Sequence, residues 1–176
     1  MENFSLPSDF IRKMQLLLNS EWEDFKTCYE NNKYQALRFN PLKKGISPDI
    51  YPQLLSTLSI PDRTPVPWAD HAYYYPDTAH PGKHPWHESG LYYIQEPSAM
   101  SAAALLAPEP GDRVLDLCAA PGGKSSQLAA YLNQTGLLVA NEIHSARCKI
   151  LSQNMERLGI SNAIVTNEDS LSLIHI

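Results

Sequence analysis

The chain has 176 residues, enough for one domain or for one small domain plus part of another. A hydrophobic content of 43% is ordinary for a globular protein, and the net charge of -5 argues against a basic nucleic-acid-binding surface over the whole chain. The three cysteines have no C-x-x-C spacing, no apolar run is long enough to cross a bilayer, and no signal-peptide pattern begins the chain. These features predict a cytoplasmic protein without disulfides and without a membrane segment.

The first third of the chain predicts a helix, a short strand and a second helix. Pro7 suits the first turn of a helix, and apolar side chains then recur at helical spacing, which predicts a stripe that faces a core. This stripe consists of Phe10, Met14, Leu17, Leu18, Phe25 and Tyr29. Residues 37–40 favour a short strand that Pro41 ends, and Ser47-Pro48-Asp49 is typical of a helix start. The apolar face of that second helix consists of Tyr51, Leu54, Leu55 and Leu58.

Residues 61–85 are rich in proline, aromatic residues and histidine, and they predict an irregular segment with little regular structure. The aromatic side chains either pack this segment onto its domain or stack on RNA bases, and packing is the more common use. They are Trp68, Tyr73, Tyr74, Tyr75 and, just after the segment, Trp86. His80, His84 and His87 match none of the usual metal-ligand spacings, so we expect no metal site. Residues 91–94 then favour a strand, and Pro97 suits the first turn of a helix that continues through Leu106.

The most informative stretch is Asp-Leu-Cys-Ala-Ala-Pro-Gly-Gly-Lys-Ser at residues 116–125. A buried strand over residues 113–117 leads into a tight loop of small residues, and a helix with inward Leu128, Ala129 and Leu132 begins at Ser125. Small residues let the backbone lie against a ligand, and the helix start offers unpaired N–H groups. A strand, a glycine loop and a helix start in this order predict a nucleotide-cofactor site. The loop residues expected at the cofactor are Cys118, Ala119, Ala120, Pro121, Gly122, Gly123 and Lys124.

Two more strand-and-helix units follow the loop. Residues 137–141 predict a buried strand that ends at Glu142, and residues 145–158 predict a helix capped by Gly159. The core positions expected on that helix are Ala146, Ile150, Met155 and Leu158. Residues 163–166 predict a third strand, with Asp169 soon after its end. In a parallel sheet Asp116, Glu142 and Asp169 would therefore share one edge, where ligands bind in doubly wound folds.

Each of these acids has a second interpretation. Asp116 could cap the loop without touching a ligand, Glu142 could be a solvated surface acid, and Asp169 could be a simple turn residue. The loop itself resembles a P-loop in Gly123-Lys124-Ser125, but Cys118 stands where that motif requires glycine. A nicotinamide dehydrogenase is disfavoured because G-x-G-x-x-G is absent. A non-catalytic RNA-binding or assembly protein is the remaining alternative.

Three stretches together resemble the NOL1/NOP/Sun family of RNA cytosine-C5 methyltransferases. They are the loop of residues 116–125, the Leu-Tyr-Tyr-Ile-Gln-Glu-Pro-Ser-Ala-Met run at 91–100 and the Leu-Arg-Phe-Asn-Pro-Leu-Lys run at 37–43. The resemblance implies a Rossmann-like class I methyltransferase domain over residues 91–176, of which three strands can be identified. A small α+β N-terminal domain with an irregular linker would occupy residues 1–90.

The resemblance also implies S-adenosylmethionine as cofactor and RNA as partner, with 16S ribosomal RNA as the expected substrate and transfer RNA as the alternative. The cofactor would lie over residues 118–124, with its ribose on Glu142 and its adenine near Asp169. We expect a monomer that uses neither a metal nor a membrane. The family's catalytic cysteines belong to later Asp-x-Pro-Cys and Thr-Cys segments, which this sequence lacks. Cys118 is therefore interpreted as a packing residue of the loop, and we expect a truncated chain that has no catalytic residue and no activity.

Overall fold

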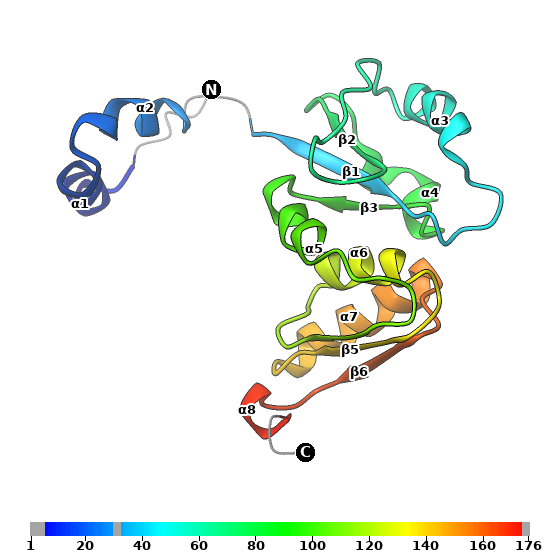
Figure 1. Ribbon diagram of the computed structural model, residues 1–176. Coiled ribbons are helices and arrows are strands. Elements are labelled where there is room, and N and C mark those ends of the chain that lie inside the picture. Colours follow the sequence, from blue (N-terminus) through cyan, green and yellow to red (C-terminus); the bar gives the residue numbers. More distant parts are fainter. Residues whose placement is uncertain (1–5, 30–32, 174–176) are drawn as a thin grey trace. The chain divides into compact units, whose positions relative to one another are not determined.

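The computed structural model describes residues 6–29 and 33–173, and the chain divides into two compact units, Met1–Lys33 and Tyr34–Ile176 (Figure 1). The first unit contains helices α1 (Ser8–Leu18) and α2 (Trp22–Thr27), joined by a 3-10 turn. Phe25 of α2 packs its ring against Phe10 and Tyr29, with centroids 6.4 and 5.4 Å away. The predicted stripe is therefore only partly correct, because Leu17 is 63% exposed while these rings form a small cluster.

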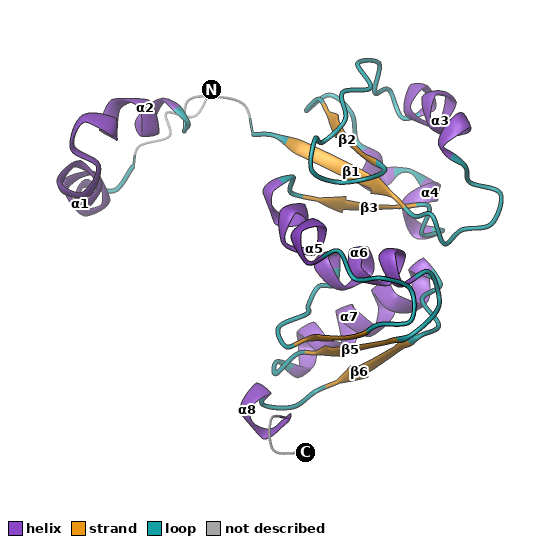
Figure 2. Ribbon diagram, viewed as in Figure 1, coloured by secondary structure: helices purple, strands orange, loops and turns teal. Residues whose placement is uncertain are grey.

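The second unit begins with a three-stranded antiparallel sheet in the order β2-β1-β3 (Figure 2). Its strands are β1 (Gln35–Phe39), β2 (Ala72–Tyr75) and β3 (Tyr92–Gln95), and short helices α3 (Tyr51–Thr57) and α4 (Pro85–Glu88) accompany it. Alternate side chains of β1 point to opposite faces of the sheet. Leu37 and Phe39 join the buried core of α3, where the Phe39 ring stacks on Tyr51 at 4.3 Å. Ala36 and Arg38 are also buried, so β1 is covered on both faces.

One expectation for this part of the chain is corrected. Strand β2 lies within the segment predicted to be irregular, because Tyr73, Tyr74 and Tyr75 pair with β1 and supply the side chains of a half-buried strand. Tyr73, Tyr75 and Trp86 pack against the core, which confirms packing as their use. Strand β3, which follows the boundary expected after residue 90, pairs with β1 over Tyr92–Gln95.

A second sheet of three parallel strands has the order β4-β5-β6, as predicted. Its strands are β4 (Arg113–Asp116), β5 (Leu137–Asn141) and β6 (Ala163–Thr166). Helix α5 (Ser101–Leu106) precedes β4, α6 (Gly123–Leu132) and α7 (Ser145–Leu158) connect the strands, and α8 (Ser170–Leu173) follows β6. This arrangement confirms the predicted α/β fold, with a Rossmann-like sheet after an N-terminal α+β portion.

Helices α6 and α7 cover one face of the parallel sheet. Leu128 and Leu132 of α6 pack with the strand residues Val114 and Leu138, as expected. On α7 the inward residues are Leu151, Met155 and Leu158, whereas Ile150 is 48% exposed and Ala146 is also exposed, so two of the four predicted core positions are wrong. Both sets of residues have helical spacing, and the direction from which α7 meets the sheet selects between them.

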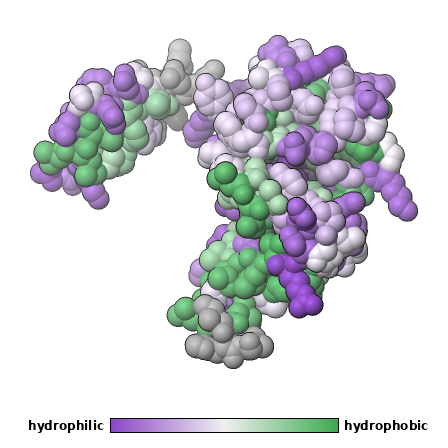
Figure 3. All heavy atoms as spheres, in the orientation of Figure 1, coloured by the Kyte–Doolittle hydropathy of each residue, from purple (hydrophilic) through white to green (hydrophobic). Residues whose placement is uncertain are grey.

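The opposite face of the parallel sheet carries a row of apolar side chains. Leu115, Val139 and Ile164 are paired neighbours across the three strands, and Leu115 and Ile164 are 53% and 51% exposed. Figure 3 shows hydrophobic surface on this side of the molecule, near α5 and the parallel strands. No helix within residues 6–29 and 33–173 is long and apolar enough to span a membrane.

Candidate cofactor site

The loop of residues 118–124 joins the end of β4 to the start of α6, and Asp116 organises it. One carboxylate oxygen of Asp116 accepts a hydrogen bond from the Ser125 hydroxyl at 2.6 Å, and the other accepts the Cys118 N–H at 3.3 Å. The side chain therefore ties both ends of the loop together across nine residues of sequence. This geometry agrees with the interpretation of Asp116 as the residue that caps the loop.

Strand β5 and helix α7 hold the loop through hydrogen bonds to its backbone. The Ala119 N–H donates to the Asn141 carbonyl of β5 at 2.8 Å. From α7, Arg147 Nη2 donates to the Ala120 carbonyl at 2.7 Å, and Asn154 Nδ2 donates to the Pro121 carbonyl at 2.8 Å. The loop thus takes its shape from β5 and α7 as much as from its own sequence.

Gly122 allows the loop to turn tightly against α7. Its φ angle of +110° is unfavourable for residues with a side chain, and a Cβ atom here would lie 3.0 Å from Met155 and 3.2 Å from Leu151. The Gly122 carbonyl accepts the Ser126 N–H at 2.8 Å, which starts the hydrogen-bond ladder of α6. Glycine is needed here for both its backbone conformation and its lack of a side chain.

A pocket of about 220 Å³ lies between the loop and the end of β3. Tyr93, Ile94, Gln95, Glu96 and Ala99 line one side of it, and Cys118, Ala119, Ala120, Pro121, Gly123 and Lys124 line the other. Gly123 again leaves room, because a Cβ atom there would lie 3.2 Å from the Gln95 amide carbon. The structure therefore places six of the seven predicted loop residues, all but Gly122, around one pocket with Gln95, Glu96 and Ala99.

Cys118 and Glu96 are the two pocket-lining side chains that carry a thiol and a carboxylate. The Cys118 thiol is exposed, so the expectation that this residue packs inside the loop is wrong. The backbone turns the side chain outward at the end of β4, while Ala119 and Ala120 take the inward positions against α7. The Ser98 hydroxyl donates to Glu96, and this hydrogen bond lowers the pKa of the Glu96 carboxyl.

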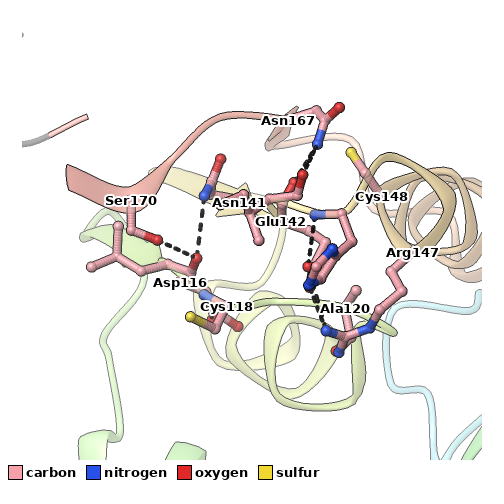
Figure 4. Close-up of polar contacts among 12 residues, drawn as sticks. Asp116, Cys118, Ala120, Asn141, Glu142, Arg147, Cys148, Asn167 and Ser170 are labelled. Atoms are coloured by element: carbon pink, nitrogen blue, oxygen red, sulfur yellow. Dashed lines mark hydrogen bonds and ion pairs between the residues drawn. The ribbon is translucent and has the colours of Figure 1, made fainter. Parts of the chain in front are cut away.

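Glu142 stands at the end of β5, as predicted, but it is not a solvated surface acid (Figure 4). The residue is only 2% exposed, and its Oε1 accepts the His144 N–H at 3.0 Å. Arg147 Nη1 lies 3.2 Å from Glu142 Oε2, and the Arg147 side chain is 52% exposed. Arg147 thus connects the strand-end acid to the loop carbonyl of Ala120.

Asp169 stands on the turn between β6 and α8. Its side chain is exposed, and its Oδ1 accepts the Leu171 N–H at 2.9 Å, as the N-cap of a helix does. Its backbone carbonyl accepts the Ser172 hydroxyl. These contacts match the alternative interpretation of Asp169 as a turn residue, and neither Asp169 nor Glu142 lines the pocket.

Sequence reasoning missed two residues that build this edge of the sheet. Asn141 is fully buried, and its amide donates to the Leu117 and Glu168 carbonyls at 3.2 and 2.9 Å, joining the ends of all three strands. Arg147 is the other, through the contacts described above. A polar residue that directly precedes a strand-end acid was the available signal for Asn141.

His84 and His87 have local contacts in the described part of the chain. His84 Nδ1 accepts the Trp86 N–H at 3.2 Å and so caps α4, and His87 Nδ1 lies 3.3 Å from Glu88. Within the described parts of the chain, no group of three or more His, Cys, Asp or Glu side chains could hold a metal ion. The contacts of His84 and His87 are therefore local and structural.

Comparison with known families gives two matches that together cover most of the chain. Residues 6–97 match the N-terminal domain of the 16S rRNA methyltransferase RsmF, and residues 103–174 match the 16S rRNA methyltransferase RsmB/F. A protein from Vibrio parahaemolyticus named ribosomal RNA small subunit methyltransferase F is 37% identical over 95% of this chain and 36% of its own length. A protein of the same name from Pectobacterium atrosepticum is 36% identical over 94% of this chain and 35% of its own length.

Solved structures with the same arrangement also exist. A methyltransferase homologue from Pyrococcus horikoshii is 28% identical, with a TM-score of 0.80 over 97% of this chain and 59% of the other. The NSun6 protein of the same organism is 17% identical, with a TM-score of 0.82 over 97% and 67% of the two chains. The chain thus spans about a third of the curated relatives and more than half of these two structures.

Proposed function

The chain belongs to the RsmF family of 16S rRNA methyltransferases, and we propose that it forms the S-adenosylmethionine site of an RNA (cytosine-5) methyltransferase. The match over residues 103–174 supports this assignment, since it covers the loop and both neighbouring strands. The proposed substrate is 16S ribosomal RNA, in keeping with the names of the relatives.

The observation that carries the proposal is the pocket between the loop and the end of β3. Its wall at residues 118–124 consists mainly of small residues, which give a ligand close access to the backbone. The sulfonium cofactor has no phosphate, so it does not need the flexible glycine loop that wraps the phosphates of ATP. Ala119, Ala120 and Pro121 make this loop stiffer than a P-loop, and that difference favours the adenosyl cofactor.

We propose that Glu142 binds the ribose hydroxyls of the cofactor. A carboxylate accepts charge-assisted hydrogen bonds, and Oε2 has Arg147 as its partner, whereas Oε1 also receives the His144 N–H. Because the Arg147 side chain is half exposed, it can turn toward solvent and open Oε2 to a ligand. Asp169, on an exposed turn after β6, is the proposed acceptor for the adenine amino group.

Titration calorimetry of the 176-residue chain with S-adenosylmethionine and, separately, with ATP tests the proposal. We expect saturable binding of S-adenosylmethionine and none of ATP at the same concentrations. Tight ATP binding would instead support a P-loop function, and absence of S-adenosylmethionine binding would contradict the cofactor assignment for this chain. The Gly122→Val variant is the control for the site, because a branched side chain at a φ of +110° would displace the loop from α7.

A further inference from the structure

Side chains from the segment 37–43 reach out of the first sheet and hold the helices of the second. Asn40 Nδ2 donates to the Leu158 carbonyl at 2.8 Å and to the Gly90 carbonyl at 3.0 Å. Lys43 Nζ donates to the Arg157 carbonyl at 3.1 Å. Both contacts satisfy carbonyls at the C-terminal end of α7, which have no partner within the helix, and the Lys43 charge also complements the helix dipole.

Arg38 makes the corresponding contact at the start of α6. Its Nη2 donates to the Ser126 hydroxyl at 2.8 Å and lies 3.4 Å from the Gly123 carbonyl. The Ser126 hydroxyl in turn donates to the Gly123 carbonyl at 3.0 Å. The guanidinium therefore braces the first turn of α6, and Gly123 of that turn is part of the pocket wall.

This arrangement is costly for the stability of the fold. Arg38 is only 4% exposed, its Nε has no hydrogen-bond partner in the described parts of the chain, and none of the ion pairs found there includes it. Burial also lowers the pKa of the guanidinium to about 10, which reflects the cost of removing the charge from water. An apolar side chain of similar size is often as stable as a buried charge, or more so. Stability therefore gives no reason for an arginine at this position.

We propose that Arg38 is a positioning residue for the cofactor site, which it serves by fixing the first turn of α6 from the neighbouring sheet. The proposal rests on the function proposed above. It gives the Leu-Arg-Phe-Asn run a second role besides forming β1, because its arginine acts on the loop and its asparagine acts on the end of α7. Arg38 acts through Ser126 and Gly123 and does not itself line the pocket.

The test compares Arg38→Met with Lys43→Met in the 176-residue chain. Each variant removes one positive charge. Arg38→Met also removes two hydrogen bonds to α6, whereas Lys43→Met removes one hydrogen bond to α7. Hydrogen exchange over residues 117–128 reports the order of the loop without any ligand, and titration calorimetry reports the affinity for S-adenosylmethionine. For Arg38→Met we expect the unmodified melting temperature or a higher one, together with roughly tenfold faster exchange and threefold to thirtyfold weaker binding. For Lys43→Met we expect unchanged exchange over the loop and unchanged affinity.

Unchanged loop exchange in Arg38→Met, or an equal effect of both variants, would overturn the positioning role. If the unmodified chain does not bind S-adenosylmethionine, the proposed function fails, while the exchange comparison still decides whether Arg38 orders the loop. If Arg38→Met does not fold, Ser126→Ala replaces it, because that change removes the hydroxyl and keeps the arginine. We expect Ser126→Ala to speed exchange over the loop, and unchanged exchange in that variant would overturn the proposal.

Discussion

Replacing Glu142 by glutamine separates its structural contacts from its proposed contact with the ribose. The amide has the same shape as the carboxylate, and its oxygen can still accept the His144 N–H that now lies 3.0 Å from Oε1. The ion pair with Arg147 is lost, but that side chain is 52% exposed, so solvent already weakens the interaction. We therefore expect at most about 1 kcal/mol of destabilisation from this pair, or roughly 2–4 °C in melting temperature for a chain of this size.

The expected effect on cofactor binding is larger. Hydrogen bonds to a charged acceptor contribute about 1.5–3 kcal/mol, and the neutral amide oxygen offers a weaker acceptor in the same place. Glu142→Gln should therefore weaken S-adenosylmethionine binding roughly tenfold to a hundredfold.

Calorimetric titration of the unmodified chain, Glu142→Gln and Arg147→Met measures both effects. Arg147→Met keeps the carboxylate but removes the side chain that covers it and the hydrogen bond to Ala120, so we expect a threefold change in affinity or less. An unchanged affinity in Glu142→Gln would refute the ribose assignment. An equal loss in both variants would show that the ion pair shapes the loop and that the acid itself does not bind the cofactor.

Two further predictions concern the stability of the fold. Gly90→Ala should lower the melting temperature by roughly 4–8 °C or more, because its Cβ would lie 2.0 Å from the Arg157 carbonyl oxygen of α7. Gly45 has a similar φ but open space around its Cβ position, so Gly45→Ala should lower the melting temperature less. Equal shifts in the two variants would contradict this reasoning. Burial raises the pKa values of Tyr51 and Tyr92 to about 12, so the unfolded chain loses these protons first and the free energy of unfolding should fall as pH rises from about 10 to 12. The lowered pKa of Arg38 acts in the opposite direction, since it makes the free energy of unfolding rise with pH. The tyrosine effect would be refuted if the melting temperature did not fall over this range. It would also be refuted if the melting temperature fell equally in the Tyr51→Phe, Tyr92→Phe double variant.

Local patterns predicted the parallel sheet and its connecting helices well. The predicted strands at residues 137–141 and 163–166 and the helix at 145–158 have the bounds that the structure shows, because strong turns and caps flank each of them. Gly159 has a φ of +72° and ends α7 as expected. The three parallel strands are neighbours in chain order, so no distant contact was needed to arrange them.

Contacts between distant segments account for most of what the sequence did not reveal. Strand β2 contains four residues in a proline-rich region, and only its pairing with β1 makes it a strand. Glu142 is buried at the strand end and pairs with Arg147, five residues further along the chain and on a different element, so the pair could not be read from local spacing. The inward side of α7 was misjudged because Ile150 and Leu151 are adjacent, and the angle of packing decides which of the two faces the sheet.

The boundary expected after residue 90 bears on the proposed cofactor site, because elements of both sheets line or support its pocket. A chain starting at residue 91 would keep each of the nine residues predicted to bind the cofactor, yet β3 would lose its pairing with β1. Ser126 would lose Arg38, and the end of α7 would lose Asn40. Gln95 and Glu96, which line the pocket opposite the loop, would then depend on a strand without a partner. Since the position of the pocket wall depends on these contacts, we expect the first sheet to contribute to the proposed cofactor site as much as the loop does.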